Sequence, residues 1–188
     1  MTPKPKSPRT ATSSVPAGTV FTIGHSTLPI DRFIGVLNAY GVEELVDVRK
    51  IPRSRHNPQF GSEALEHELA TASIHYVWMK ALGGRHHARP DSPNSGWRNK
   101  SFRGYADYMQ AGAFESAIDE LVEISRRKRT VIMCAEAVPW RCHRSLVADA
   151  LCVRDIPVDD IFSETSSRPH TLTPFAHVEG THITYPPE

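Results

Sequence analysis

The sequence alternates short apolar runs rich in β-branched residues with longer segments whose apolar residues recur at helical spacing. Runs of the first kind are typical of buried strands, and they cover residues 19–23, 44–48, 74–79, 130–133 and 158–163. The helical pattern covers residues 29–41, 62–72, 105–110, 113–127 and 143–155. Parallel strands joined by helices need right-handed crossovers, which place helices on both faces of the sheet. We therefore predict a three-layer α/β fold with a mostly parallel sheet of about five strands.

The composition of the two ends differs from that of the middle. Residues 1–18 are rich in Pro, Ser, Thr and basic residues and lack an apolar run, so we expect a disordered leader. Residues 19–165 are expected to form a single α/β domain, since the 188-residue chain is long enough for one core. Residues 166–188, rich in Pro and His, are expected to be an irregular C-terminal tail.

Composition also bears on the compartment. The sequence contains neither the apolar segment of a secretion signal nor an apolar stretch long enough to span a membrane. Three cysteines without such a signal are typical of a reducing environment. We expect a cytoplasmic protein with no membrane partner. The formal net charge of +1 indicates nothing about other partners.

Basic residues concentrate in the loops that follow the predicted strands. In open parallel sheets, ligands bind outside the carboxyl ends of the strands, which here lead into residues 24–29, 49–60, 80–104 and 134–144. The Lys and Arg residues of these loops are Arg49, Lys50, Arg53, Arg55, Lys80, Arg85, Arg89, Arg98, Lys100, Arg103, Arg141 and Arg144. Only two acids, Asp91 and Glu136, accompany them. Such a rim attracts anions, so we expect an anionic small molecule, a nucleotide or a nucleic acid as partner. The alternatives are solvated side chains paired with helix acids, and a surface for protein contacts.

The first two loops carry candidate binding residues. Gly24, at the tip of the first strand, permits a close backbone approach. His25 titrates near neutrality and is a candidate for proton transfer, whereas Ser26 is a candidate for binding or for capping the next helix. Asp47 and Arg49 lie on the same face of the second strand. They form either a structural ion pair or part of an anion site that also includes Arg53 and Arg55.

The fourth loop concentrates reactive side chains. Cys134 directly follows a strand, and Cys142, His143 and Arg144 open the next helix. A thiol close to a helix N-terminus, an Arg and a His is shifted toward the reactive thiolate. We expect Cys134 to be the nucleophile or redox thiol and Cys142 its resolving partner, with Arg144 holding the anion. The structural alternative is that Cys134 is a small buried hydrophobic residue.

Two histidines and one acid complete this hypothesis. His143 and His25 are the candidates for proton transfer, and Glu136 is expected to orient one of them. This arrangement is typical of a cysteine-dependent transferase or hydrolase.

The spacing of the two cysteines leaves other chemistries open. Zinc fingers use two close cysteine or histidine pairs, whereas seven residues separate Cys134 from Cys142. A looser transition-metal site that includes His25 or the His86–His87 pair remains an alternative. A reversible disulfide between Cys134 and Cys142 would suit a redox role.

The ordered motifs "TIGHST", "LVDVRKIPRSRHNPQF", "LGG", "YADYM" and "MCAEAVPWRCHRSLVADAL" resemble the family catalogued as domain of unknown function 488. The resemblance extends over about residues 21–162 and implies no settled activity. The signature positions that it implies are Gly24, His25, Ser26, Asp47, Arg49, Pro52, Cys134, Glu136, Cys142, His143 and Arg144.

The layout is also distantly similar to rhodanese-like domains, in which a strand-end "DVR" precedes a catalytic cysteine whose loop wraps an anion. Rhodaneses return to a basic residue within about six positions of that cysteine. Here Arg141 and Arg144 follow Cys134 by seven and ten positions, and Pro139 interrupts the loop. The short anion cradle of that family is therefore absent from this sequence.

Overall fold

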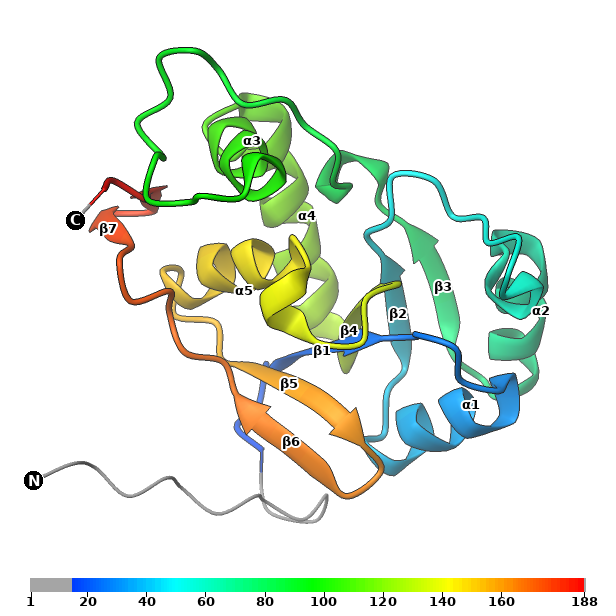
Figure 1. Cartoon of the computed structure of the whole chain (residues 1–188). Coiled ribbons are helices and arrows are strands. Elements are labelled where there is room, and N and C mark those ends of the chain that lie inside the picture. Colours follow the sequence, from blue (N-terminus) through cyan, green and yellow to red (C-terminus); the bar gives the residue numbers. More distant parts are fainter. Residues whose placement is uncertain (1–14, 188) are drawn as a thin grey trace, which may run out of the picture.

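Six strands form one sheet in the order β3-β2-β4-β1-β5-β6 (Figure 1). The computed structural model describes residues 15–187, so residues 1–14 of the expected leader lie outside it. The strands are β1 Val20–Gly24, β2 Glu44–Asp47, β3 His75–Trp78, β4 Thr130–Cys134, β5 Val158–Ser163 and β6 Ser166–Pro169. The pairings among β1 to β5 are parallel, and β6 joins β5 in the antiparallel sense.

Helices cover both faces of the sheet (Figure 1). They are α1 Ile30–Ala39, α2 Ser62–Thr71, α3 Lys100–Tyr108, α4 Gly112–Arg127 and α5 Arg144–Cys152. Alternate strand residues face opposite sides, so Leu45 packs in the core cluster with α1 and α2 and Val46 in the cluster with α3, α4 and α5. The predicted three-layer α/β fold is confirmed. No helix within residues 15–187 is both long and apolar enough to cross a membrane.

The C-terminal segment is more ordered than its composition indicates. Beyond β6 it forms the hairpin of β7 His177–Glu179 and β8 His182–Thr184. Tyr185 is fully buried, and its hydroxyl donates to Asp149 Oδ2 across 2.8 Å. The expectation of an irregular tail from residue 166 was therefore wrong, because Ile183 and Tyr185 complete the core cluster around α3, α4 and α5.

The sheet has its topological switch point between β1 and β4. These strands are parallel neighbours, and Gly24 lies opposite Cys134 at their carboxyl ends. The chain then leaves β1 toward α1 on one face and β4 toward α5 on the other (Figure 1). Divergence of two adjacent loops opens a crevice at that edge of a parallel sheet.

Candidate functional site

A cleft of about 550 Å³ opens at this switch point, within the usual range of small-molecule sites of about 300–1,000 Å³. All four loops that follow the parallel strands contribute to it. Its wall includes His25, Ser26, Arg49, Lys50, Arg53, Gly84, Arg85, Cys134, Glu136 and His143. Arg55, expected among the binding residues, is exposed and does not line the cleft.

The floor of the cleft depends on a close backbone contact. A β-carbon on Gly24 would lie 1.7 Å from the carbonyl oxygen of Glu136, so only glycine lets the β4–α5 loop pass there. The amide N–H groups of His25 and Ser26 donate to the carbonyls of Cys134 and Ala135, each across 2.9 Å. These contacts place the first loop directly beside the cysteine loop. Gly24 and Ser26 thus have a visible structural role in shaping the floor.

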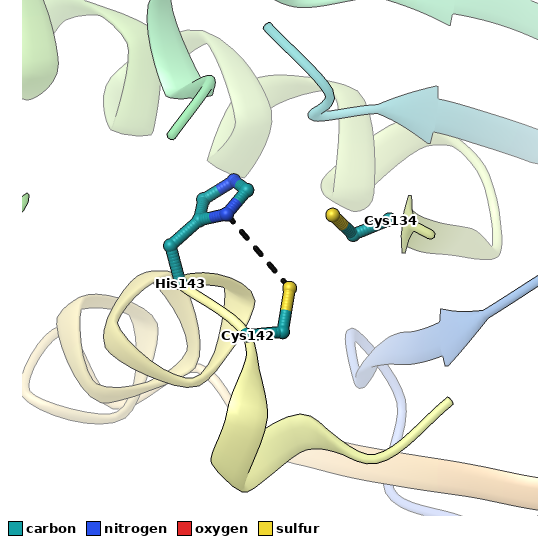
Figure 2. A group of neighbouring side chains, drawn as sticks. All are labelled: Cys134, Cys142 and His143. Carbon is teal, nitrogen blue, oxygen red and sulfur yellow. Dashed lines mark hydrogen bonds between the residues drawn. The ribbon is translucent and has the colours of Figure 1, made fainter. Parts of the chain in front are cut away.

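Cys134, Cys142 and His143 form one cluster (Figure 2). Cys134 and His143 line the cleft, and Cys142 lines an adjoining pocket of about 280 Å³. Their Sγ and ring nitrogen atoms all lie within 4.8 Å of one another, and Cys142 Sγ is 3.8 Å from His143 Nδ1. Both thiols are free and buried, at 8% and 3% exposure. The strand end of β4 supplies one thiol, and the start of α5 supplies the other two groups. The sequence placed these residues near one another, and the structure brings them into one cluster.

The ring of His143 is held in a defined orientation. His143 Nε2 lies 3.0 Å from the carbonyl oxygen of Val48, and a carbonyl can only accept, so Nε2 carries the proton. The other ring nitrogen, Nδ1, points toward Cys142 Sγ. Gly84 allows this approach, since a β-carbon there would lie 2.9 Å from Nδ1.

The two thiols shift each other's pKa in opposite directions. The pKa of Cys142 is lowered to about 7, because Cys134 hydrogen-bonds to it and Arg144 adds positive charge, which together outweigh its burial. The same hydrogen bond, with burial, raises the pKa of Cys134 well above its ordinary value. This differs from the expectation that Cys134 carries the reactive thiolate. The thiol with the lowered pKa is Cys142, which lies at the helix start beside Arg144.

Arg144 clasps the loop between the two cysteines. Its side chain is fully buried, with Nη1 donating to the carbonyl of Glu136 at 2.5 Å and Nη2 to that of Ala137 at 3.1 Å. The Nη1 and Nη2 groups of Arg144, which were expected to hold an anion, are therefore hydrogen-bonded to loop carbonyls instead. A rhodanese-like cradle presents backbone N–H groups to the anion instead. Arg144 is thus a positioning residue whose charge has no carboxylate partner within residues 15–187.

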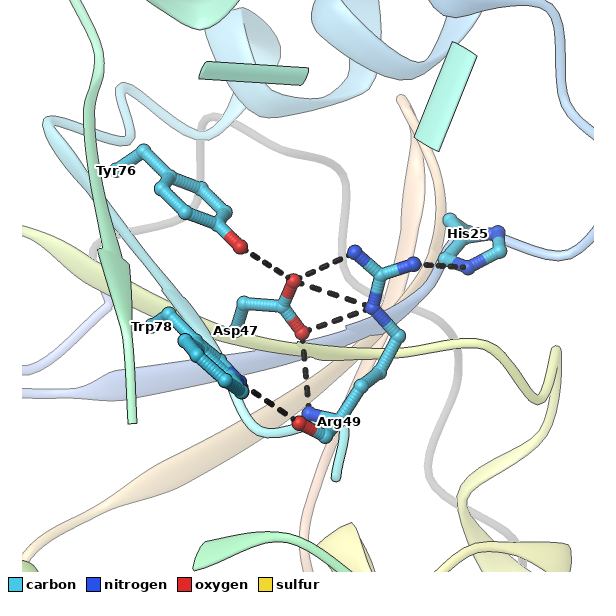
Figure 3. A network of polar contacts seen from close by, with 5 residues as sticks. All are labelled: His25, Asp47, Arg49, Tyr76 and Trp78. Carbon is cyan, nitrogen blue, oxygen red and sulfur yellow. Dashed lines mark hydrogen bonds and ion pairs between the residues drawn. The ribbon is translucent and has the colours of Figure 1, made fainter. Parts of the chain in front are cut away.

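Asp47 and Arg49 form a buried ion pair beside the cleft (Figure 3). Arg49 Nε and Nη2 donate to the Asp47 carboxylate across 2.5–3.1 Å, and Tyr76 donates its hydroxyl to Oδ2 across 2.8 Å. Trp78 Nε1 donates to the backbone carbonyl of Arg49. The sequence left open whether this pair is a structural ion pair or part of an anion site. The structure fits the ion pair, because Asp47 is fully buried and its charge is compensated by Arg49.

His25 adjoins the free end of this network. Its Nδ1–H donates to its neighbour Ser26 across 2.8 Å, Nε2 faces Arg49 Nη1 at 3.4 Å, and the ring stacks on Phe60. Burial, aided by the charge of Arg49, lowers the pKa of His25 to about 4. His25 is therefore neutral at pH 7, which leaves it unable to supply a proton there.

Three cations border the cleft without an ion-pair partner in the described part of the chain: Lys50, Arg53 and Arg85. Glu136 faces the same cleft, and its exposed carboxylate makes no hydrogen bond to His25 or His143. The expected role of Glu136 in orienting a histidine therefore does not fit the structure.

Several contributors were missed from the sequence. Lys50 and Arg85 were counted in the basic rim but not singled out, and the Val48 carbonyl and Gly84 were not considered. Backbone carbonyls leave no signal in a sequence, whereas the double glycine of "LGG" is a signal that could have indicated a close approach at Gly84. The His86–His87 pair, considered for a metal, is not part of the cluster: His86 bonds to Gly83 and stacks on Tyr108.

Comparison with known families places these elements in a wider context. The sequence model described as "Domain of unknown function DUF488" matches residues 29–151. The chain belongs to this DUF488 family. The matched region runs from the start of α1 through most of α5, and so includes Asp47, Arg49, Cys134, Cys142 and His143. The DUF488 match does not extend to Gly24, His25 and Ser26, which precede it. Neither the curated proteins nor the solved structures give a significant match.

Proposed function

We propose that this DUF488 chain is an enzyme that binds an anionic substrate in the cleft at the switch point and acts on it at the Cys134–Cys142–His143 centre. The observation that carries the proposal is that Cys134 and His143 of this centre line the same cleft as Lys50 and Arg53, which make no ion pair within residues 15–187.

The anion site is assigned to side chains that are free to bind. Arg49 is neutralised by Asp47, and Arg144 is occupied by loop carbonyls. Lys50, Arg53 and Arg85 have no such partners in the described chain and come from two different loops. Guanidinium groups bind phosphate and carboxylate oxygens in pairs. A phosphate-, sulfur- or nucleotide-bearing substrate therefore fits this side of the cleft.

The chemistry is assigned to the centre as a unit. Cys142, whose pKa is lowered to about 7, supplies a nucleophile, and His143 Nδ1, 3.8 Å from Cys142 Sγ, is placed to accept the proton of its thiol. Because Arg144 is occupied by the loop after Cys134, covalent chemistry of the rhodanese type at Cys134 has little support. Group transfer or hydrolysis at the centre is the reaction class that remains.

The alternative is a nucleotide or nucleic-acid binder that grips phosphates without chemistry, favoured by the same cations. Affinity would then fall steeply with salt, and loss of the centre would leave binding unchanged. A binder has no use for two buried thiols and an oriented histidine at the inner end of its site, and we prefer the enzyme for this reason.

The test combines binding and turnover. Inorganic phosphate and adenosine 5′-monophosphate serve as probes in calorimetry, and nitrophenyl phosphate, nitrophenyl sulfate and nitrophenyl thioesters serve in activity assays. Binding should weaken more than about tenfold in Arg53→Ala/Arg85→Ala and stay unchanged in Arg55→Ala, the neighbouring arginine outside the cleft. Turnover should be lost in Cys142→Ser and kept in Cys152→Ser. Unchanged binding in the double variant, or no turnover of any probe, refutes the enzyme.

A further inference from the structure

We propose that Cys134 Sγ, Cys142 Sγ and His143 Nδ1 bind one divalent transition metal of the zinc class, with a fourth coordination position open to the cleft. The inference rests on the proposed function, because it names the cofactor of the same centre.

The spacing of the ligand atoms suits such an ion. Bonds of about 2.3 Å to sulfur and about 2.0 Å to nitrogen place tetrahedral ligand atoms about 3.3–3.8 Å apart. Cys142 Sγ and His143 Nδ1 are already 3.8 Å apart, and all three atoms lie within 4.8 Å of one another. Small rotations of the three side chains would bring all three ligand atoms to bonding distance from one central ion.

The ring of His143 has the orientation that a ligand needs. The hydrogen bond to Val48 fixes the proton on Nε2 and leaves Nδ1 directed at Cys142. Metal-binding histidines commonly donate their second ring N–H to a carbonyl or carboxylate in this way. Gly84 removes the side chain that would otherwise cover Nδ1.

Three protein ligands leave the site open. Within residues 15–187 the cluster contains no fourth Cys, His, Asp or Glu. His25, which also lines the cleft, has both ring nitrogens in contact with other groups, Ser26 and Arg49. Structural zinc sites have four protein ligands, whereas catalytic sites have three and an open position. Because Cys134 and His143 also line the cleft, the open position faces the bound anion.

The charges are consistent with an anionic fourth ligand. Binding displaces a proton from each thiol, so two thiolates and a divalent ion sum to zero. The buried Arg144, which lacks a carboxylate partner in the described chain, then favours a negative group on the metal. Two thiolates with an imidazole select zinc and related ions over magnesium or calcium. The substrate's anionic group is thus predicted to reach the metal itself.

The experiment uses untagged full-length protein purified under reducing conditions. Elemental analysis should find about one zinc-class ion per chain. Replacement by cobalt(II) should give thiolate-to-cobalt charge-transfer bands and the intense visible bands of tetrahedral cobalt. Cys134→Ser, Cys142→Ser and His143→Ala should each lower the affinity for cobalt more than about tenfold, whereas Cys152→Ser and His86→Ala should not. Circular dichroism distinguishes ligand loss from unfolding.

The outcomes separate this inference from the proposed function. Wild-type protein with neither metal nor cobalt–thiolate bands, or a Cys142→Ser variant that binds cobalt normally, overturns the metal site. If arginine-dependent anion binding and Cys142-dependent turnover persist in that case, the enzyme stands without a metal. A metal that phosphate and adenosine 5′-monophosphate leave spectroscopically unchanged overturns the open position instead.

Discussion

Gly24 and the carbonyl of Glu136 approach so closely that a β-carbon on Gly24 would lie 1.7 Å from the oxygen. This contact joins the loops after β1 and β4 and determines how Cys134 faces Cys142. A larger residue must push the cysteine loop away, since backbone cannot interpenetrate.

The first prediction follows directly. Gly24→Ala should destabilise the protein by about 1–3 kcal/mol, as overpacking does, and should weaken cobalt binding by displacing Cys134. Urea unfolding and cobalt titration measure both effects. Gly112→Ala is the control, because a β-carbon there meets nothing within 4 Å. If Gly24→Ala matches Gly112→Ala in both assays, the backbone contact does not position the cysteine loop.

The second prediction concerns Arg144, which holds the same loop from the other side. Arg144→Met removes the hydrogen bonds that the buried guanidinium donates to the carbonyls of Glu136 and Ala137, each worth about 1.5–3 kcal/mol because the donor is charged. Stability measured by urea unfolding should fall accordingly. The control is Arg141→Met, an exposed arginine in the same loop that makes no ion pair with any residue of 15–187. An Arg144→Met variant as stable as Arg141→Met would contradict the clasp.

The third prediction concerns the Asp47–Arg49 pair. Asp47→Asn leaves a buried guanidinium without its counter-charge, which costs about 3–5 kcal/mol. Tyr76→Phe removes only one donor to the same carboxylate and should cost about 1 kcal/mol. The matched control, Asp91→Asn, breaks the exposed pair with Arg89 and should change stability by less than about 1 kcal/mol. If Asp47→Asn and Asp91→Asn lose the same stability, burial of the Asp47–Arg49 pair does not increase the cost of breaking it.

The fourth prediction concerns pH and the C-terminal segment. His170 lies between Asp149 and Asp160, with Nε2 at 2.9 Å and Nδ1 at 3.2 Å from their oxygens. Thr22 and Tyr185 also donate to these carboxylates. Although burial opposes it, hydrogen bonds to Asp149 and Asp160 raise the pKa of His170 to about 9 from an ordinary 6.5.

Because the folded pKa lies above the unfolded one, protonated His170 stabilises the fold. That contribution is complete below about pH 6.5, and it is lost as pH rises to about 9. The loss should be on the order of 3 kcal/mol. Urea unfolding at pH 6 and pH 9.5 measures it in wild type and in His170→Gln, which should show a flatter profile, with the exposed His177→Gln as control. Equal slopes for His170→Gln and wild type would exclude His170 as the cause.

The fold was largely predictable because it depends on local patterns. The runs containing Val20, Leu45 and Val131 are buried on both faces and therefore read as continuous apolar strands. Residues 166–187 were misjudged, because their order depends on tertiary contacts. Tyr185 reaches Asp149 in α5 from the far end of the chain, and no local pattern encodes that contact.

The location of the site could be predicted from the sequence, whereas the roles of its individual residues could be predicted less well. The rule for parallel sheets located the four loops, and the chemistry of Cys134, Cys142 and His143 singled out the centre. The sequence does not show which arginines are free to bind an anion. The partners of Arg144, for example, are the backbone carbonyls of Glu136 and Ala137, which carry no sequence signal. The opposite pKa shifts of Cys134 and Cys142 likewise depend on a hydrogen bond between the two ends of the loop, which the sequence does not show.

The central claim, that one cleft holds both the anion and the thiol centre, is tested most directly by alkylation. The protein as purified is treated with iodoacetamide, with and without inorganic phosphate, and the modification of each cysteine is quantified by peptide mass spectrometry. Phosphate should slow modification of Cys134 and Cys142 but not of Cys152, which lies at the far end of α5. Protection should persist in Arg55→Ala and vanish in Arg53→Ala/Arg85→Ala. Identical rates with and without phosphate at Cys134 and Cys142 would contradict the account.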